Sequence, residues 1–370
     1  MKLTGITWDH PRGYDPVVAA SGAYRAETGI EIAWSKRSLQ AFADAPIAEL
    51  AAEYDFIVLD HPHVGQIAEA GALLPLPGPK DADASLGGSA ESYLWRGQCW
   101  AYALDAACQM AAFRPDLARP LPRRWEDFLG DDAARFRPLT PLLPVDAFDM
   151  FMTLVAGRGE DEMPRGAGHF VSGENGLYAL AVLRALYRLG PPEQVEMNPI
   201  AVLETLSDGD DFACSPCLFG YVNYARAGFR RNPVAYFDLP LCDGATRPRA
   251  ILGGAGIGVS ARTGHPDAAT DFARWITSPG VQSGVYLANN GQPANRHTWL
   301  AEAESGDATG FFKGGFHTIA NAWTRPRAPW FLGFVDEVCA IMPDFFRKDI
   351  PAEDFLTRID RLFRHHYKEN

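Results

Sequence analysis

Three short apolar runs alternate with three helix-like segments in the first 76 residues, and this rhythm restricts the fold more than any other feature. The predicted strands are 3–8, 30–34 and 56–59, and the predicted helices are 16–28, 46–54 and 64–70. The run at 56–59 is continuously apolar, as expected for a strand that is buried on both faces of a parallel sheet. The order therefore predicts a doubly wound α/β domain.

The rest of the chain is long enough for a second domain. The whole chain has 370 residues, whereas one hydrophobic core rarely grows beyond about 250–300 residues. Strands are predicted at 99–104, 108–113 and 250–260, the first two divided by Asp105 and Ala106. Further helices are predicted at 125–129, 176–189, 266–277, 334–345 and 355–363.

Charge and hydropathy exclude several classes of function. Lys and Arg total 34 against 46 for Asp and Glu, so the formal charge is −12, which disfavours general binding to nucleic acid or anionic membranes. No apolar run approaches the ~18 residues of a membrane span. No signal-peptide pattern follows Met1, which predicts a cytoplasmic protein if Met1 is the native start. The alternative is a periplasmic protein whose signal has been removed.

Motifs for covalent, redox or metal chemistry are weak. Six cysteines are too few for a disulfide scaffold, and Cys214 and Cys217 form one isolated C-x-x-C pair. The sequence lacks G-x-S-x-G, a phosphate-binding G-x-x-x-x-G-K-[ST] and H-E-x-x-H. His61 and His63 with Asp9 could bind a metal, but closely spaced histidines also act as plain hydrogen-bonding groups. We therefore expect no cofactor, no metal and no enzymatic activity.

Polar side chains gather in the three loops that follow the predicted N-terminal strands. In open α/β sheets, ligands bind beyond the carboxyl ends of the strands, so these loops meet at the edge where a ligand is expected. The alternative is that they are merely solvated loop tips. Asp60 offers an acceptor there, and the predicted ligand-binding residues from these loops are Trp8, Asp9, His10, Arg12, Lys36, Arg37, Ser38, His61 and His63.

Several motifs together resemble one protein family. They are the segments 55–60 with 66–76, 97–105 with 112–117, 122–129, 251–260, 265–276 and 291–296. The first three groups are similar to "YDV…D…LAE.G.L.PL", "G…YALP.D…L.YR.DL" and "P.TWDEL". Segments 251–260 and 265–276 together are similar to "GG.GLAVS…HPE.A..F..F", and 291–296 is similar to "G..PA.R". These are patterns of the extracellular solute-binding proteins of carbohydrate ABC transporters, and the resemblance covers most of the chain.

The resemblance implies an α/β fold of the type II periplasmic-binding-protein class, with two lobes that hinge strands join and that close like a flytrap. The first lobe would hold residues 1–105 and 251–303, and the second 106–250 and 304–370. The ligand would bind in the cleft between them. The residues nominated on this basis, at the hinge or in the second lobe, are Tyr102, Asp105, Phe219, Tyr221, Asn223, Trp323 and Arg325. Gly254, in the glycine-rich strand predicted at 250–260, is expected to face the cleft.

The expected function is capture of a small polar molecule, either sugar-like or anionic, by a monomer. Arg12, Lys36 and Arg37 would supply charge-assisted hydrogen bonds to an anion. The expected partner is an ABC permease, or, for an intracellular sensor, a protein that reads ligand occupancy. The alternative is an enzyme on the same fold that resembles pyrimidine-precursor synthases and uses histidine with the cysteine pair.

Overall fold

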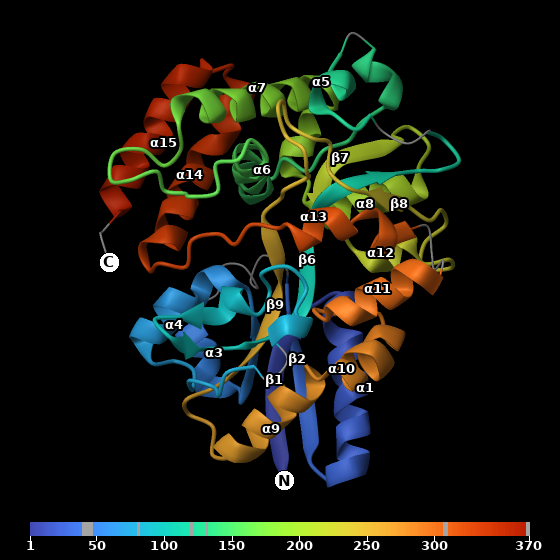
Figure 1. The fold of residues 1–370 in the computed structure, drawn as a ribbon, viewed down its shortest axis with the longest axis vertical. Coiled ribbons are helices and arrows are strands. Elements are labelled where there is room, and N and C mark those ends of the chain that lie inside the picture. The colour runs from blue at the N-terminus through green and yellow to red at the C-terminus, as the bar shows by residue number, and fades with distance from the viewer. Residues whose placement is uncertain (39–46, 80–81, 119–121, 131, 306–309, 368–370) are drawn as a thin grey trace.

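The chain forms two α/β lobes, one above the other in Figure 1, with two long strands passing between them. A computed structural model describes residues 1–38, 47–79, 82–118, 122–130, 132–305 and 310–367. Within these residues, no helix combines the length and the apolar character that a membrane crossing needs.

The lower lobe is built on the predicted N-terminal strands. The strands are β1 (Lys2–Trp8), β2 (Glu31–Arg37) and β3 (Phe56–Leu59), and the helices beside them are α1 (Pro11–Thr28), α3 (Ile47–Glu53), α4 (Val64–Ala70), α9 (Pro266–Ile276) and α10 (Pro279–Val281). Strand β1 pairs in parallel with β2 and β3, which confirms the predicted parallel arrangement at this end of the sheet. All four residues of β3 are fully buried, as the continuous apolar run predicts.

The upper lobe is mainly helical. Its helices are α5 (Trp125–Phe128), α6 (Pro144–Gly157), α7 (Gly173–Leu189), α8 (Pro199–Asp208), α14 (Trp330–Arg347) and α15 (Ala352–His366), with strands β7 (Cys214–Phe219) and β8 (Ala235–Phe237). Short helices α11 (Arg296–Ser305), α12 (Phe311–Gly314) and α13 (Phe316–Ala320) lie near the waist. A small hairpin of β4 (Leu94–Trp95) and β5 (Gln98–Cys99) precedes the first crossing.

Strands β6 (Tyr102–Phe113) and β9 (Leu252–Val259) run from one lobe into the other as an antiparallel pair (Figure 1). The sheet order is β2-β1-β3-β9-β6-β7, and β8 also pairs with β6. The prediction of two strands divided at Asp105 was wrong, because Asp105 and Ala106 stay in the ladder opposite β9 and only a bulge marks the division. The interruption of the apolar pattern therefore marks the hinge and not the end of a strand.

Three predicted boundaries shift in the lower lobe. Helix α1 begins at Pro11 and not at residue 16, because the His10 side chain accepts the Arg12 N–H and caps the first turn. Strand β2 continues to Arg37, so Lys36 and Arg37 lie within a strand and not in the following loop. Residue 46, the predicted start of the second helix, lies outside the described residues, and α3 occupies the rest of that segment up to Glu53.

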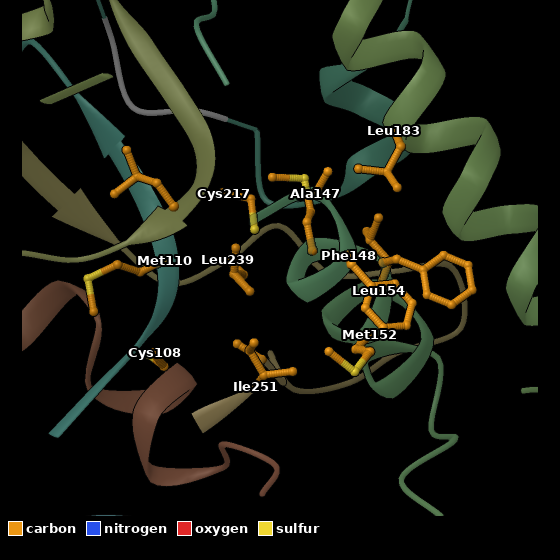
Figure 2. Packing of buried hydrophobic residues seen from close by; sticks show 14 of the residues in the cluster. Cys108, Met110, Ala147, Phe148, Met152, Leu154, Leu183, Cys217, Leu239 and Ile251 are labelled. Carbon is orange, nitrogen blue, oxygen red and sulfur yellow. The ribbon is translucent and has the colours of Figure 1, made fainter. Parts of the chain in front are cut away.

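Separate hydrophobic cores fill the two lobes. The lower core includes Val17, Phe56 and Phe272, whereas the upper core centres on α6, which is buried from Asp146 to Ala156. Figure 2 shows Phe148, Met152 and Leu154 of α6 in the same cluster as Cys217 of β7 and Ile251. Cys214 and Cys217 are fully buried, and burial raises the pKa of the Cys214 thiol to about 12. The cysteine pair is therefore part of the upper core.

Candidate ligand-binding site between the lobes

Arg12 joins three parts of the fold at the waist. From the first turn of α1, its Nε donates to Asp105 Oδ2 on β6 at 2.9 Å, and Nη2 pairs with the other carboxylate oxygen. Its Nη1 donates to the carbonyl of Gly220, just after β7, at 3.1 Å. The guanidinium lies 4.6 Å from the centre of the Tyr221 ring. Arg12 therefore connects the lower lobe, the hinge strand and the upper lobe.

The surroundings of Arg12 fix its charge state and that of His10. Burial opposes the charged guanidinium, but the Asp105 carboxylate outweighs it, so the pKa of Arg12 rises above its ordinary value. Burial, with Arg12 nearby, lowers the pKa of His10 to about 3, so this imidazole is neutral at pH 7. The His10 ring lies edge-on to Tyr221, with 4.8 Å between ring centres, and its Nε2 has no hydrogen-bond partner among the described residues.

Arg325 makes a second connection between the lobes. It comes from the loop before α14 and its Nη2 donates to Asp60 Oδ2, beyond β3, at 2.5 Å. Its Nη1 lies 3.4 Å from Asp149 Oδ1 on α6. The Asp60 carboxylate also accepts the N–H of His61 at 2.7 Å, which caps a short 3-10 helix over His61–His63. One guanidinium thus holds carboxylates from both lobes.

The two carboxylates differ in their ionisation. Burial disfavours the charge on Asp60, but Arg325 and the neighbouring His61 together outweigh burial and lower the pKa of Asp60. Burial raises the pKa of Asp149 to about 6 despite Arg325. Burial also lowers the pKa of His61 to about 4, so this ring is neutral at pH 7. His61 Nε2 is buried without a hydrogen-bond partner among the described residues.

Asp146 completes the polar groups at the junction. It lies one helical turn before Asp149 on α6 and is 6% exposed. Among the residues that the structure describes, it has no hydrogen bond and no ion pair, and burial next to Asp149 raises its pKa well above the usual range. This carboxyl group therefore has no partner on the described part of the protein and is available to a ligand.

The other predicted site residues from the N-terminal loops make contacts that do not involve Arg12 or Arg325. The Trp8 ring is buried in the lower core, where it covers Gly13. Asp9 and Lys36 form an exposed ion pair at 2.9 Å. Arg37 donates to the Val58 carbonyl at 2.8 Å, and burial lowers its pKa to about 10. Of the remaining two, Ser38 is exposed and His63 is buried beside His61.

The residues nominated around the hinge and in the upper lobe form hydrogen bonds or pack in different parts of the protein. The Tyr102 hydroxyl donates to the Pro77 carbonyl at 2.8 Å, inside the lower lobe. Asn223 is fully buried and its Nδ2 donates to the Asn290 carbonyl at 3.4 Å. Trp323 donates through Nε1 to the Asp161 carbonyl at 2.5 Å, within the upper lobe. Phe219 covers Gly253, and Gly254 crosses the hinge next to the backbone of Asp105.

Sequence reasoning did not select Asp146, Asp149 or Tyr93. Tyr93 is buried and its hydroxyl donates to the Leu59 carbonyl at 3.3 Å, next to the short helix at His61. A usable signal was present for the two aspartates, because they stand three residues apart in the otherwise apolar segment 144–157. Two carboxylates on one face of an apolar helix need a partner or a function.

A cavity of about 320 Å³ lies in the lower lobe away from these groups. Tyr102 is the one predicted site residue in its wall, beside Arg274, Trp275 and Asn295. Among the described residues, no three His, Cys, Asp or Glu side chains are grouped so that they could hold a metal ion.

Comparison with known proteins identifies the fold. No protein-family model matches the chain, and no curated protein matches it. Among solved structures, maltose-bound MalE3 of T. maritima is 18% identical, with a TM-score of 0.80 over 98% of this chain and 99% of that one. The GacH receptor of Streptomyces glaucescens, solved unliganded and with acarbose, is 14% identical, with a TM-score of 0.81 over 99% of each chain.

A third similar structure is an ABC transporter solute-binding protein of Thermotoga lettingae bound with α-D-tagatose. It is 14% identical, with a TM-score of 0.79 over 98% of this chain and 99% of that one. The likeness extends over nearly the full length of each protein. The chain therefore has the predicted two-lobed type II periplasmic-binding-protein fold.

Proposed function

We propose that this protein is a solute-binding protein that captures a small polar ligand between its lobes, without chemical conversion. The observation that carries the proposal is the set of buried, incompletely paired polar groups where the lobes meet, on a fold shared with three sugar-bound or acarbose-bound proteins. His10, His61, Asp146, Asp149 and Arg325 would contact the ligand. Arg12 and Asp105 would position the lobes around it.

The moving bodies in this proposal follow the predicted division, residues 1–105 with 251–303 and residues 106–250 with 304–370. We propose one refinement at the place where the chain passes from the lower into the upper lobe for the second and last time. Trp299 packs with ring centres 5.4 Å and 5.0 Å from Phe311 and Phe312, and it belongs to the upper hydrophobic core. The crossing would therefore precede Trp299 and not follow residue 303.

The proposed physiological role is uptake together with an ABC permease, by analogy with the solute-binding protein of Thermotoga lettingae. Uptake would place the protein outside the cytoplasmic membrane, whereas an intracellular sensor would remain in the cytoplasm, so cell fractionation separates the two roles. The enzyme alternative gains no support. Its cysteine pair is buried in the upper core, and burial raises the thiol pKa values far above neutrality.

Native mass spectrometry of protein purified from its own organism tests the proposal. We expect a retained small molecule whose mass is the difference between the native and the denatured protein. Incubation of the released molecule with fresh protein should return it unchanged, because the proposed function is capture without chemical conversion. Accumulation of a product over many turnovers would contradict the proposal.

A further inference from the structure

The polar groups at the lobe junction include more carboxyl groups than guanidiniums. The carboxylates are Asp60, Asp105, Asp146 and Asp149, and the buried guanidiniums are Arg12 and Arg325. His10 and His61 add no charge at neutral pH. Arg327, the next cation along the loop, turns outward to the carbonyls of Glu91 and Leu94.

Four of these groups lie together. Asp60, Arg325 and Asp149 are linked by direct contacts, and Asp146 follows on the same face of α6. Arg12 and Asp105 form the other ion pair at the waist, beside the Tyr221 ring. The carboxyl groups next to Arg325 therefore outnumber the guanidiniums next to them.

Asp146 is the carboxyl group that has no partner among the described residues. Each of the other three carboxylates contacts a guanidinium, whereas Asp146 has no hydrogen bond or ion pair with any described residue. An acidic residue in the first turn of a helix usually stabilises the helix dipole from the surface. This one is 94% buried, being 6% exposed, so it loses hydration that the dipole alone does not replace.

The cations that could attract an anionic ligand are already engaged. Arg12 is held by Asp105, Lys36 by Asp9, and Arg37 donates to the Val58 carbonyl. An anion at the junction would meet Asp146 and Asp149 at close range. A neutral ligand would leave Asp146 and Asp149 without a cation of their own, whereas an ammonium group would favour their ionised forms.

We infer that the ligand of this site is a small polyhydroxylated amine, such as an amino sugar, whose protonated nitrogen binds between Asp146 and Asp149. This inference rests on the proposed function and adds the charge of the ligand. His10 Nε2 and His61 Nε2, both buried without partners among the described residues, would form hydrogen bonds with its hydroxyl groups. The ammonium group would supply the donor that Asp146 lacks.

A matched pair of saccharides tests the inference by titration calorimetry. The probes are the trisaccharide of glucosamine, which is cationic, and the trisaccharide of N-acetylglucosamine, which is neutral. We expect the amine to bind at least about tenfold more tightly, as one charge-assisted hydrogen bond would give. Asp146→Asn should remove this preference, whereas Asp267→Asn, in the exposed first turn of α9, should keep it.

Thermal melting shows whether a lost preference for the amine comes from the site itself or from unfolding of the variant. Because burial raises the pKa of Asp146, Asp146→Asn exchanges a poorly solvated carboxyl group for an amide of the same shape, so at pH 7 the free variant should melt at the wild-type temperature or above it while it loses the preference for the amine. Equal or tighter binding of the neutral trisaccharide would overturn the inference and leave the proposed function intact. If the molecule retained in native mass spectrometry is neutral or anionic, the inference likewise fails alone. If neither trisaccharide binds and no molecule is retained, both fail.

Discussion

Arg12→Met is expected to lower the free energy of unfolding by about 3–5 kcal/mol, because it leaves the Asp105 carboxylate buried and unpaired at the hinge. Removal of one partner of a buried ion pair costs far more than loss of the pair, since the remaining charge keeps its desolvation penalty. Arg12 also bonds Gly220, so the variant loses a contact between the lobes. Chemical denaturation monitored by circular dichroism measures the change.

Two further variants isolate the cause. The exposed pair of Lys36 and Asp9 is a matched control, and Lys36→Met should leave the melting temperature almost unchanged, because water already screens this pair. Combining Arg12→Met with Asp105→Leu should restore much of the lost stability, because the unpaired charge is then gone. If Arg12→Met costs no more than Lys36→Met, the pair at the hinge does not hold the lobes as described.

Gly254→Ala is expected to destabilise the protein by more than about 3 kcal/mol, because two effects coincide. Gly254 has a φ of +109°, a conformation that residues with a Cβ rarely adopt. A Cβ there would also overlap the carbonyl oxygen of Asp105 on the opposite hinge strand. The two hinge strands would have to separate at the point where they cross between the lobes.

Gly228→Ala separates these two effects. Gly228 has a φ of +82°, but no atom lies within 4 Å of the position that its Cβ would take. Its substitution should therefore cost only the backbone strain, about 1–2 kcal/mol. Similar losses for the two variants would show that the close approach of β6 and β9 at Gly254 contributes nothing to stability.

Local sequence patterns predicted much of the lower lobe because its elements follow local rules. The continuous apolar run at 56–59 became the fully buried strand β3. Gly29 and Gly71, which directly follow the first and third predicted helices, both adopt left-handed conformations there. The start of α1 was missed because histidine is an uncommon helix cap, so the signal at His10 was weak.

The site was harder to predict, because its partners are far apart in the sequence. The strand-edge argument found His10, Arg12 and His61, since all three follow strand ends. It could not show that Arg12 would meet Asp105, 93 residues away, or that Arg325 would meet Asp60, 265 residues away. Sequence reasoning therefore named both members of each ion pair but not their pairing.

Small-angle X-ray scattering tests the central claim, that the lobes close on a ligand, most directly. The protein would be measured as purified with its retained molecule, and again after the molecule is removed by reversible unfolding and dialysis. We expect a larger radius of gyration after removal, because contacts such as that between Arg325 and Asp60 would separate, and a return to the smaller value when the molecule is added back. An identical radius of gyration in all three samples would contradict closure of the lobes on the ligand.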